Sequence, residues 1–498
     1  MNDPLPPPSE IARHTVRGSM YSVAASAVTI GLGVLRTYLM VTLLLPDQIG
    51  LAALGYLIVQ LGVQFGSLGL AGAFIHKLDP TPADRQTYYT FHLLIGALSL
   101  ASIALAAPVI ARLYPDFEGL LPVIWLYAAL SLVTILNQPQ VAFLEKDLRF
   151  NRVAALDVTG ALATTIAGPG LALLGFGVWA VVGEFAAGAL ARFAVIHFRL
   201  RPFRPHLGWD RASAGWLWRY GRSVWMNSNL TYALDHFDDF WVGTSLGKGS
   251  LGLYSKAYEF SRYPRRLIAN PILSVFFPTF AYLQGDRTRL SRAFFRACSL
   301  IVRFGGLLAL LAAIAAPEVF RLFLPEAWQP MRPIFQVMIV YTFLDPLLLA
   351  VRRLLLATGR PAEINRAGWI QLAVFIPGVI LGARLGGILG VALAADLMVL
   401  VGVVLLFRAA RRVVDYSPVT LWLKPAIAVA GIAGLALAAS PGLAGIPDPW
   451  TLAGKLILIP ILYTGFLYTA EREQLLTGVR MIRGLLSSGT FPGKNASH

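Results

Sequence analysis

Apolar residues fall in long runs of roughly 20 residues along almost the whole chain, and short polar segments separate these runs. A helix of about that length crosses the hydrocarbon core of a bilayer. No segment alternates apolar and polar residues with the period of a strand, so the runs are predicted to be transmembrane helices. About fourteen spans are expected, near residues 18–45, 50–75, 88–112, 120–143, 154–174, 177–198, 221–246, 251–283, 297–316, 330–351, 367–384, 387–407, 421–440 and 450–470.

The composition supports this interpretation. The 498 residues are 56% hydrophobic and 14% charged, with a mean hydropathy of +0.65, which is typical of an all-α polytopic membrane protein and excludes a soluble globule. Cys298 is the only cysteine, so the chain has no internal disulfide and no thiolate metal site. Neither a metal nor a cofactor is expected, because the histidines lack ligand spacing and residues 243–248 (GTSLGK) are one residue short of a P-loop.

The net charge of +16 is explained by topology and not by nucleic-acid binding. If the N-terminus is cytoplasmic, about 29 Lys and Arg lie in inner segments. Five lie outside: Arg112, Lys248, Arg321, Arg332 and Arg384. This bias predicts a multi-pass membrane protein with both termini cytoplasmic, and the basic inner surface attracts anionic lipids.

The chain contains a weak internal repeat. An offset of about 202 residues aligns RTYLMVTLLLPDQIGLAALGY, from Arg36, with DDFWVGTSLGKGSLGLYSKAY, from Asp238. Similar echoes occur between residues 175–180 and 387–394. The repeat predicts four parts: an N-terminal six-helix lobe (1–198), a basic cytoplasmic linker (199–220), a second six-helix lobe (221–412), and two extra helices with a cytoplasmic tail (413–498). The alternative interpretation of the basic segment is a docking site for lipid headgroups.

Charged residues within the predicted spans are the candidate functional residues, because an ionised group in hydrocarbon is costly and needs water, a substrate or a partner. They are concentrated between Tyr232 and Arg266. Candidates for gating or coupling are Asp235, Asp238, Asp239 and Glu259. Candidate cations are Lys256, Arg262 and Arg266, and Pro264 predicts a break in the helix that carries them. The alternative is that these charges pair with one another as purely structural ion pairs.

Arg262 and Arg266 lie one helical turn apart and could bind successive anionic groups such as a pyrophosphate. Arg36 lies in the outer part of the first span, at the position equivalent to Asp238. These two residues are predicted to pair across a central cleft when its outer side is closed. Local structural pairing is expected for the other charges in or near the spans: Glu184, Arg192, Arg303, Asp345 and Asp396.

Five segments carry a family resemblance, namely LRTYLMVTLLLPDQIGL, GSLGLAGAFIHK, FLEKDLRFNR, LGFGVWAVV and DHFDDFWVGTSLGKGSLGLYSKAYEF. Their order resembles the polysaccharide-transporter branch (Wzx-type flippases) of the multidrug/oligosaccharidyl-lipid/polysaccharide (MOP) exporter superfamily. The resemblance covers roughly residues 15–410. It implies two six-helix lobes in a V around a central, often cationic cavity, with cavity roles for Arg36, Lys256, Arg262 and Arg266. This chain departs from the commoner family pattern by carrying more charge in GLYSKAYEFSRYP.

The function implied by the resemblance is the flipping, by alternating access, of polyprenyl-pyrophosphate-linked oligosaccharides for exopolysaccharide, capsule or O-antigen-type glycans. The implied partners are this lipid-linked substrate and membrane lipids, with a polysaccharide polymerase and a chain-length regulator as further candidates. Two alternatives remain open. One is a cation-coupled drug or solute exporter of the same superfamily, which would use Asp235, Asp238, Asp239 or Glu184 as ion sites. The other is an envelope glycosyltransferase or ligase, and the short outer loops argue against an enzyme.

Overall fold

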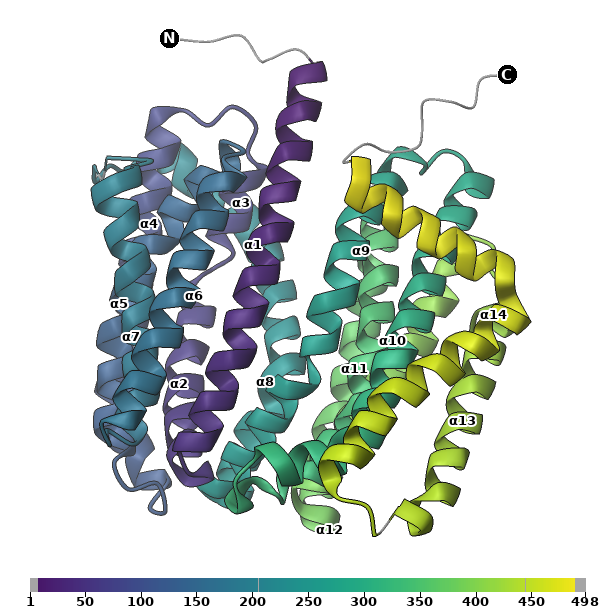
Figure 1. Cartoon of the computed structure of the whole chain (residues 1–498). Coiled ribbons are helices and arrows are strands. Elements are labelled where there is room, and N and C mark those ends of the chain that lie inside the picture. The colour runs from purple at the N-terminus through teal and green to yellow at the C-terminus, as the bar shows by residue number, and fades with distance from the viewer. Residues whose placement is uncertain (1–7, 205, 444, 489–498) are drawn as a thin grey trace. The chain divides into compact units, whose positions relative to one another are not determined.

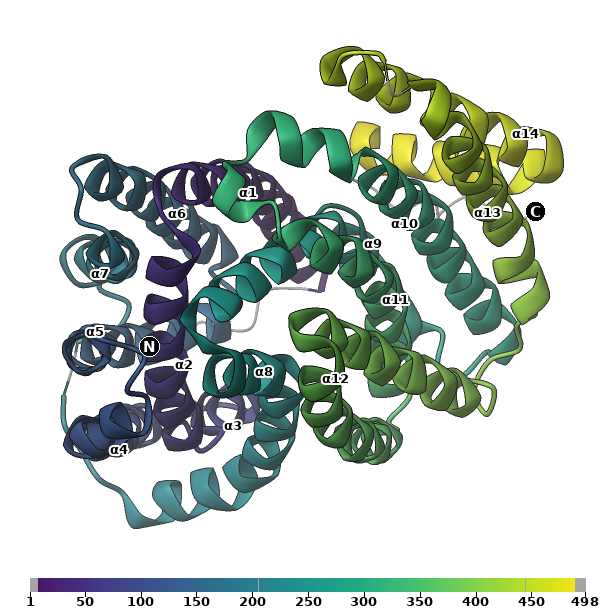
Figure 2. The ribbon, with the colours of Figure 1, turned by 90° about the horizontal axis from the view of Figure 1, so that it is seen from below.

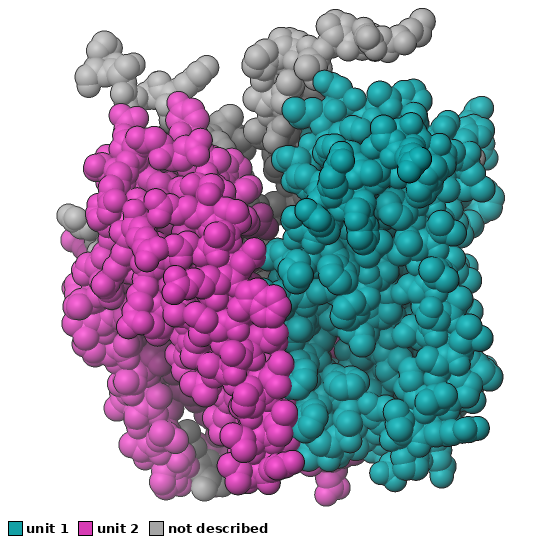
Figure 3. All heavy atoms as spheres, turned by 180° about the vertical axis from the view of Figure 1, so that it is seen from behind, with its two compact units in different colours: residues 1–256 teal, residues 257–498 magenta. Residues whose placement is uncertain are grey.

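All the regular secondary structure in the part of the chain that the structure describes is helical (Figure 1). This computed structural model describes residues 8–204, 206–443 and 445–488, without the side chains of 8–24, 264–271, 274–275, 443 and 473–488. The described helices pack into two compact units, residues 1–256 and 257–498 (Figure 3). The boundary lies inside one helix, after Lys256, whereas the division into lobes at 198 and 221 stays a prediction.

Unit 1 consists of α1 (Pro8–Leu43), α2 (Pro46–Gly66), α3 (Leu70–His76), α4 (Pro82–Leu113), α5 (Leu120–Lys146), α6 (Phe150–Leu173), α7 (Val178–Ala194), the π-helical turn η1 (Val195–Leu200) and most of α8 (Arg211–Ser261). Within this unit, α4, α5, α7 and α6 stand side by side in that order (Figure 2). An aromatic core around Phe74, Tyr88 and Phe143 joins α3, α4 and α5.

Unit 2 begins with the end of α8 and contains α9 (Tyr263–Tyr282), α10 (Arg287–Phe323), the 3-10 turn η2 (Glu326–Trp328), α11 (Met331–Ala357), α12 (Pro361–Ala410), α13 (Pro418–Leu443) and α14 (Asp448–Ser488). Helices α13 and α14 pack against α10. Glu471, where the backbone of α14 leaves helical geometry, accepts a hydrogen bond from Arg303 of α10 (Nε to Oε2, 2.8 Å). The expected local pairing is therefore confirmed for Arg303, and also for Arg192, which pairs with Asp157 at 3.2 Å.

Eleven described helices are long and apolar enough to cross a membrane. One of them, α12, bends at Gly386 and Gly387, and its two parts correspond to the predicted spans 367–384 and 387–407. Helices α8 and α9 are not among the eleven, and they hold most of the charged candidate residues. Helix α8 has a non-helical residue at Gly247, between the predicted seventh and eighth spans. The expected break near Pro264 is confirmed, because α8 ends at Ser261 and α9 begins at Tyr263 with the proline in its first turn.

The predicted second span, 50–75, is wrong as a single helix. The chain leaves helical geometry after Gly66, and both Leu68 and Gly69 have positive φ before α3 begins. A broken helix exposes backbone carbonyls that need donors in a membrane. The Trp225 indole of α8 donates to the carbonyl oxygen of Phe65 at 2.9 Å. The carbonyl group that the break leaves without a helical donor is thus hydrogen-bonded by a side chain far away in the sequence of unit 1.

Two pairs of turns support the internal repeat. Gly177, before α7, and Gly387, in the bend of α12, share a backbone conformation (φ 56°, ψ −125° and φ 56°, ψ −139°). The turns after α5 and α11 also match. The Arg149 amide donates to the Leu144 carbonyl, and the Arg360 amide donates to the Leu355 carbonyl, five residues back and at 2.8 Å in both cases. Equivalent turns at similar spacing are what a duplicated six-helix unit requires.

Candidate functional site

Asp238 connects the two arms of α8. Its side chain is buried, with 4% of its surface exposed, and lies on the arm before Gly247. The Tyr254 hydroxyl, on the arm after Gly247, donates to Asp238 Oδ2 at 2.6 Å, and the Asp239 amide donates to Oδ1 at 3.0 Å. A short hydroxyl-to-carboxylate bond is a strong one. It offsets part of the cost of burying the carboxyl and fixes the angle between the two arms.

Asp239 and His236 form the second polar contact on α8. The His236 Nδ1 lies 3.6 Å from Asp239 Oδ2, while the buried Oδ1 of Asp239 accepts no hydrogen bond from the described residues. The His236 ring also packs against Tyr232 with centroids 4.5 Å apart. Asp235 is half-buried on the same helix. Three acidic groups and one imidazole thus lie within two turns of α8, and their role in gating or coupling stays a prediction.

Arg36 of α1 forms an ion pair with Glu184 of α7, with 3.7 Å between Nη1 and Oε1. The two side chains are 25% and 16% exposed. The expected local pairing is confirmed for Glu184, and Arg36 is the cation that supplies it. The proposed pairing of Arg36 with Asp238 stays a prediction, and in this structure Tyr254 is a partner of Asp238.

The candidate cations lie around the junction of α8 and α9. Arg262 occupies the turn between these helices, and its guanidinium carbon lies 4.9 Å from the ring centroid of Tyr258. The Tyr258 hydroxyl donates in turn to the Tyr341 hydroxyl of α11 at 3.0 Å. Glu259 is half-buried in this region. Both tyrosines were missed in the sequence, where nothing distinguishes them from packing residues.

The binding roles of the other two predicted cations near this junction, Lys256 and Arg266, stay predictions. Lys256 is half-buried and is the last residue of unit 1. The side chain of Arg266 lies outside the described residues, so its spacing from Arg262 along the chain remains the basis for assigning the two a common role. Within the described residues, the structure brings together Asp238 with Tyr254, Asp239 with His236, Arg36 with Glu184, and Arg262 with Tyr258.

The long apolar helices and the charges buried among them define a polytopic α-helical membrane protein. The chain belongs to the family described as "Polysaccharide biosynthesis protein", whose pattern matches residues 39–333. The resemblance found in the sequence is therefore confirmed.

Individual relatives agree with this assignment. The chain is 24% identical over 402 residues to the lipopolysaccharide biosynthesis protein WzxC of Escherichia coli (strain K12), covering 78% of this chain and 80% of the relative. It is 23% identical over 319 residues to the succinoglycan biosynthesis transport protein ExoT of Rhizobium meliloti (strain 1021), covering 64% of each chain. The structure of the lipid II flippase MurJ in an inward closed conformation matches 92% of this chain and 100% of its own, with a TM-score of 0.75 and 14% identity, and so shares the fold.

Proposed function

We propose that this protein translocates polyprenyl-pyrophosphate-linked oligosaccharides from one leaflet of a membrane to the other. The observation that carries the proposal is the family match over residues 39–333, which includes all of α8 and α9 with their charged residues. Two relatives named for lipopolysaccharide biosynthesis and succinoglycan transport support a glycan as the cargo. The product would serve exopolysaccharide, capsule or O-antigen-type glycan assembly.

The chemistry of the cargo explains the cations. A pyrophosphate carries several negative charges, and arginine binds phosphate oxygens with two parallel N–H groups. Arg36, Lys256, Arg262 and Arg266 are proposed to bind the pyrophosphate and the sugars during transport. The polyprenyl chain stays in lipid, where its transfer costs least.

We further propose that transport proceeds by alternating access of two six-helix lobes, residues 1–198 and 221–412, joined by the linker 199–220 and followed by α13 and α14. Asp235, Asp238, Asp239 and Glu259 would gate the path or couple it to an ion. The protein is proposed to lie in the bacterial plasma membrane with both termini cytoplasmic, and to deliver its cargo to a polysaccharide polymerase and a chain-length regulator. The Lys and Arg bias of the loops supports this orientation.

A specific observation favours one second candidate, a cation-coupled drug or solute exporter. Asp238 and Asp239 are buried side by side in α8, 4% and 8% exposed, and adjacent buried carboxyls in a membrane protein are typical ion-coupling groups. The two candidate functions differ in the charge of the cargo, because an exporter of organic cations would not use Arg262 and Arg266 to bind it.

Reconstitution separates the two. Purified protein in liposomes, given a fluorescent polyprenyl-pyrophosphate oligosaccharide, is expected to exchange it between leaflets faster than protein-free liposomes. The same liposomes, loaded with an organic cation and placed under a sodium or proton gradient, are expected to show no efflux. Gradient-driven cation efflux without glycan exchange would replace the flippase proposal with the exporter.

A further inference from the structure

The segment between α7 and α8 presents a basic and aromatic edge to the outside of unit 1. We call this edge the linker rim. Its members are exposed and lie within residues 199–211: Arg199, Arg201, Arg204, Leu207, Trp209 and Arg211. Leu207 has 76% of its surface exposed and Trp209 has 55%. Large apolar side chains that are exposed beside a row of cations are unfavourable in water and typical of a membrane interface.

The inner side of the same segment is attached to the core of unit 1. Phe203 packs against Phe143 of α5, with ring centroids 4.8 Å apart, and its carbonyl accepts a hydrogen bond from Gln140 at 3.3 Å. The Gly208 amide donates to the Thr90 hydroxyl of α4 at 3.0 Å. One face of the segment between α7 and α8 is therefore attached to α4 and α5, whereas the residues of the linker rim are exposed.

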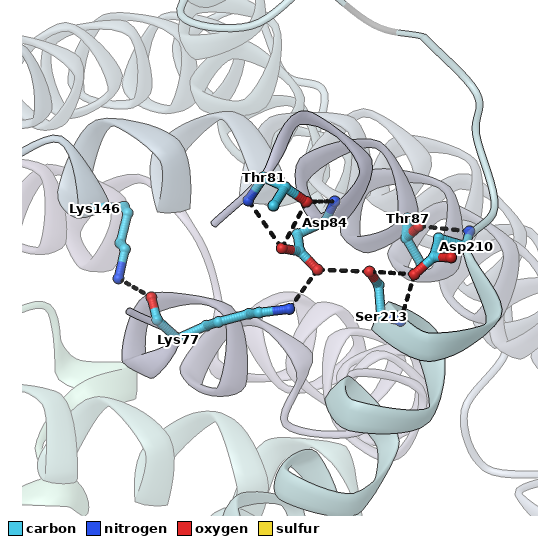
Figure 4. A network of polar contacts seen from close by, with 7 residues as sticks. All are labelled: Lys77, Thr81, Asp84, Thr87, Lys146, Asp210 and Ser213. Carbon is cyan, nitrogen blue, oxygen red and sulfur yellow. Dashed lines mark hydrogen bonds and ion pairs between the residues drawn. The ribbon is translucent and has the colours of Figure 1, made fainter. Parts of the chain in front are cut away.

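A polar network around Asp84 holds the end of this segment against α4 (Figure 4). Asp84 is 4% exposed and accepts hydrogen bonds from Lys77, from the amide and hydroxyl of Thr81 (2.9 and 2.8 Å), and from the Ser213 hydroxyl of α8 (2.6 Å). The Ser213 amide donates to Asp210 Oδ2 at 2.7 Å, and the Ser213 hydroxyl oxygen also lies 2.7 Å from that oxygen, so its single proton is shared between Asp84 and Asp210. The pKa of Asp210 is lowered because these bonds favour its ionised form.

The network has a structural consequence for the rim. The Ser213 hydroxyl contacts Asp84 and the Asp210 amide donates to the Thr87 hydroxyl at 2.9 Å, so the start of α8 is tied to the first two turns of α4. The rim is therefore placed in advance and loses little conformational freedom when it binds a ligand. The apolar span Val178–Leu200 ends where the rim begins. The rim therefore lies at the depth where a bilayer changes from hydrocarbon to headgroups.

We propose that the linker rim is a binding site for anionic phospholipid headgroups, with its arginines on the phosphates and with Leu207 and Trp209 inserted between lipids. Arginine pairs with phosphate through two parallel N–H groups, and tryptophan prefers the interface. The proposal concerns the surrounding membrane and not the transported cargo, so it is independent of the proposed function. Its position at the end of a membrane span favours lipid over nucleic acid as the anionic partner.

The sole cysteine allows a direct test. Cys298 is buried, so a Cys298→Ala, Leu207→Cys protein can carry one environment-sensitive fluorophore on the rim. The full-length protein is placed in nanodiscs that contain a fixed fraction of headgroup-proximal nitroxide lipid as quencher, while phosphatidylglycerol replaces increasing fractions of the phosphatidylcholine. Quenching of the fluorophore is expected to rise with the fraction of phosphatidylglycerol. It is expected to fall in about 0.5 M salt, because salt screens the attraction between exposed arginines and anionic headgroups. Quenching that is independent of both would overturn the proposal without any further variant.

A matched pair of charge variants locates the site. Arg199→Gln, Arg201→Gln, Arg204→Gln is expected to require about tenfold more phosphatidylglycerol for half-maximal quenching, because each interfacial arginine contributes to anionic lipid binding. The control, Arg289→Gln, Arg292→Gln, Arg296→Gln, removes the same charge from exposed residues of α10 and should leave the midpoint unchanged. Equal shifts in both variants would show a general charge effect and would sink the assignment to the rim.

Discussion

Gly50 and Gly252 each pack against the backbone of the segment that carries the other. A Cβ on Gly50 would lie 1.8 Å from the carbonyl oxygen of Lys248, and a Cβ on Gly252 would lie 2.0 Å from that of Pro46. An offset of about 202 residues carries Gly50 to Gly252 and Pro46 to Lys248. The contact is therefore reciprocal, as expected for two repeats related by a local two-fold axis.

Alanine at either glycine is expected to destabilise the protein. The clashing atoms are backbone carbonyl oxygens, which cannot rotate away as a flexible side chain could, so each substitution should cost about 1–3 kcal/mol or more. Gly50→Ala and Gly252→Ala should reduce the amount of monodisperse protein in membranes and its thermal midpoint in detergent. Gly170→Ala is the control, because no atom outside its own stretch of helix lies within 4 Å of its added Cβ. Equal behaviour of all three variants would show that the close contact is not required.

The helices were predictable because bilayer thickness and loop charge act locally on the sequence. Apolar length located the spans, and Pro264 located the break after Ser261. The break at residues 67–69 was missed because it depends on a donor that lies far away in sequence. Only the fold brings the Trp225 indole to the Phe65 carbonyl. The sequence around the break, GSLG, contains no proline that would have marked it.

The ion pair between Arg303 and Glu471 is predicted to hold α14 against α10. The side chains are 6% and 1% exposed, and removing one member of a buried pair leaves an uncompensated charge that costs about 3–5 kcal/mol. Arg303→Met and Glu471→Met should each lower the thermal midpoint strongly, and the double variant should recover much of the loss. Arg287→Met, which breaks the exposed pair with Asp415 (51% and 73% exposed), is the matched control and should change little. A double variant with fully additive losses would contradict the pairing argument.

The charged residues of the candidate site can be recognised in the sequence more readily than their partners. Asp238, Asp239 and Arg262 are conspicuous because ionised groups are rare in spanning helices. The Tyr254 hydroxyl is a side-chain partner of Asp238, and helical periodicity cannot relate these two residues because Gly247 turns the chain between them. The sequence shows that Arg36 needs an anionic partner, but Glu184 is one of several acidic residues within the predicted spans. Only the packing of the helices identifies it, with 3.7 Å between Arg36 Nη1 and Glu184 Oε1.

Removing the arginines at the start of α9 tests the pyrophosphate role. A hydrogen bond to a charged group is worth about 1.5–3 kcal/mol, so Arg262→Ala or Arg266→Ala should slow glycan exchange in liposomes by about 10- to 100-fold. Lysine should restore only part of the rate because it offers a point charge and not a fork. Arg353→Ala is a control on α11, where an exposed arginine packs over Phe277. Normal exchange by the double alanine variant, at equal protein levels, would remove these residues from the proposed site.

Arg36 has two candidate anionic partners, and charge exchange distinguishes them. Glu184 contacts it in this structure, whereas the internal repeat predicts that Asp238 pairs with it in a state closed on the outer side. Because an unpaired charge in a span is costly, Arg36→Asp should impair exchange, and the true partner should restore it when changed to arginine. If the Glu184 contact persists through the transport cycle, Glu184→Arg will rescue and Asp238→Arg will not.

Rescue by Asp238→Arg would instead indicate that Arg36 changes partner during transport. A conformational change of that kind shifts the population of states, so accessibility should change along with activity. A cysteine introduced at Thr244, an exposed residue near the Gly247 bend of α8, on the Cys298→Ala background reports this through its rate of maleimide labelling. The rate should rise in Arg36→Asp and in Asp238→Arg and should fall again in the exchanged pair. Unchanged labelling together with purely additive losses of activity would show that Arg36 and Asp238 act independently, and the gate assignment would then be wrong.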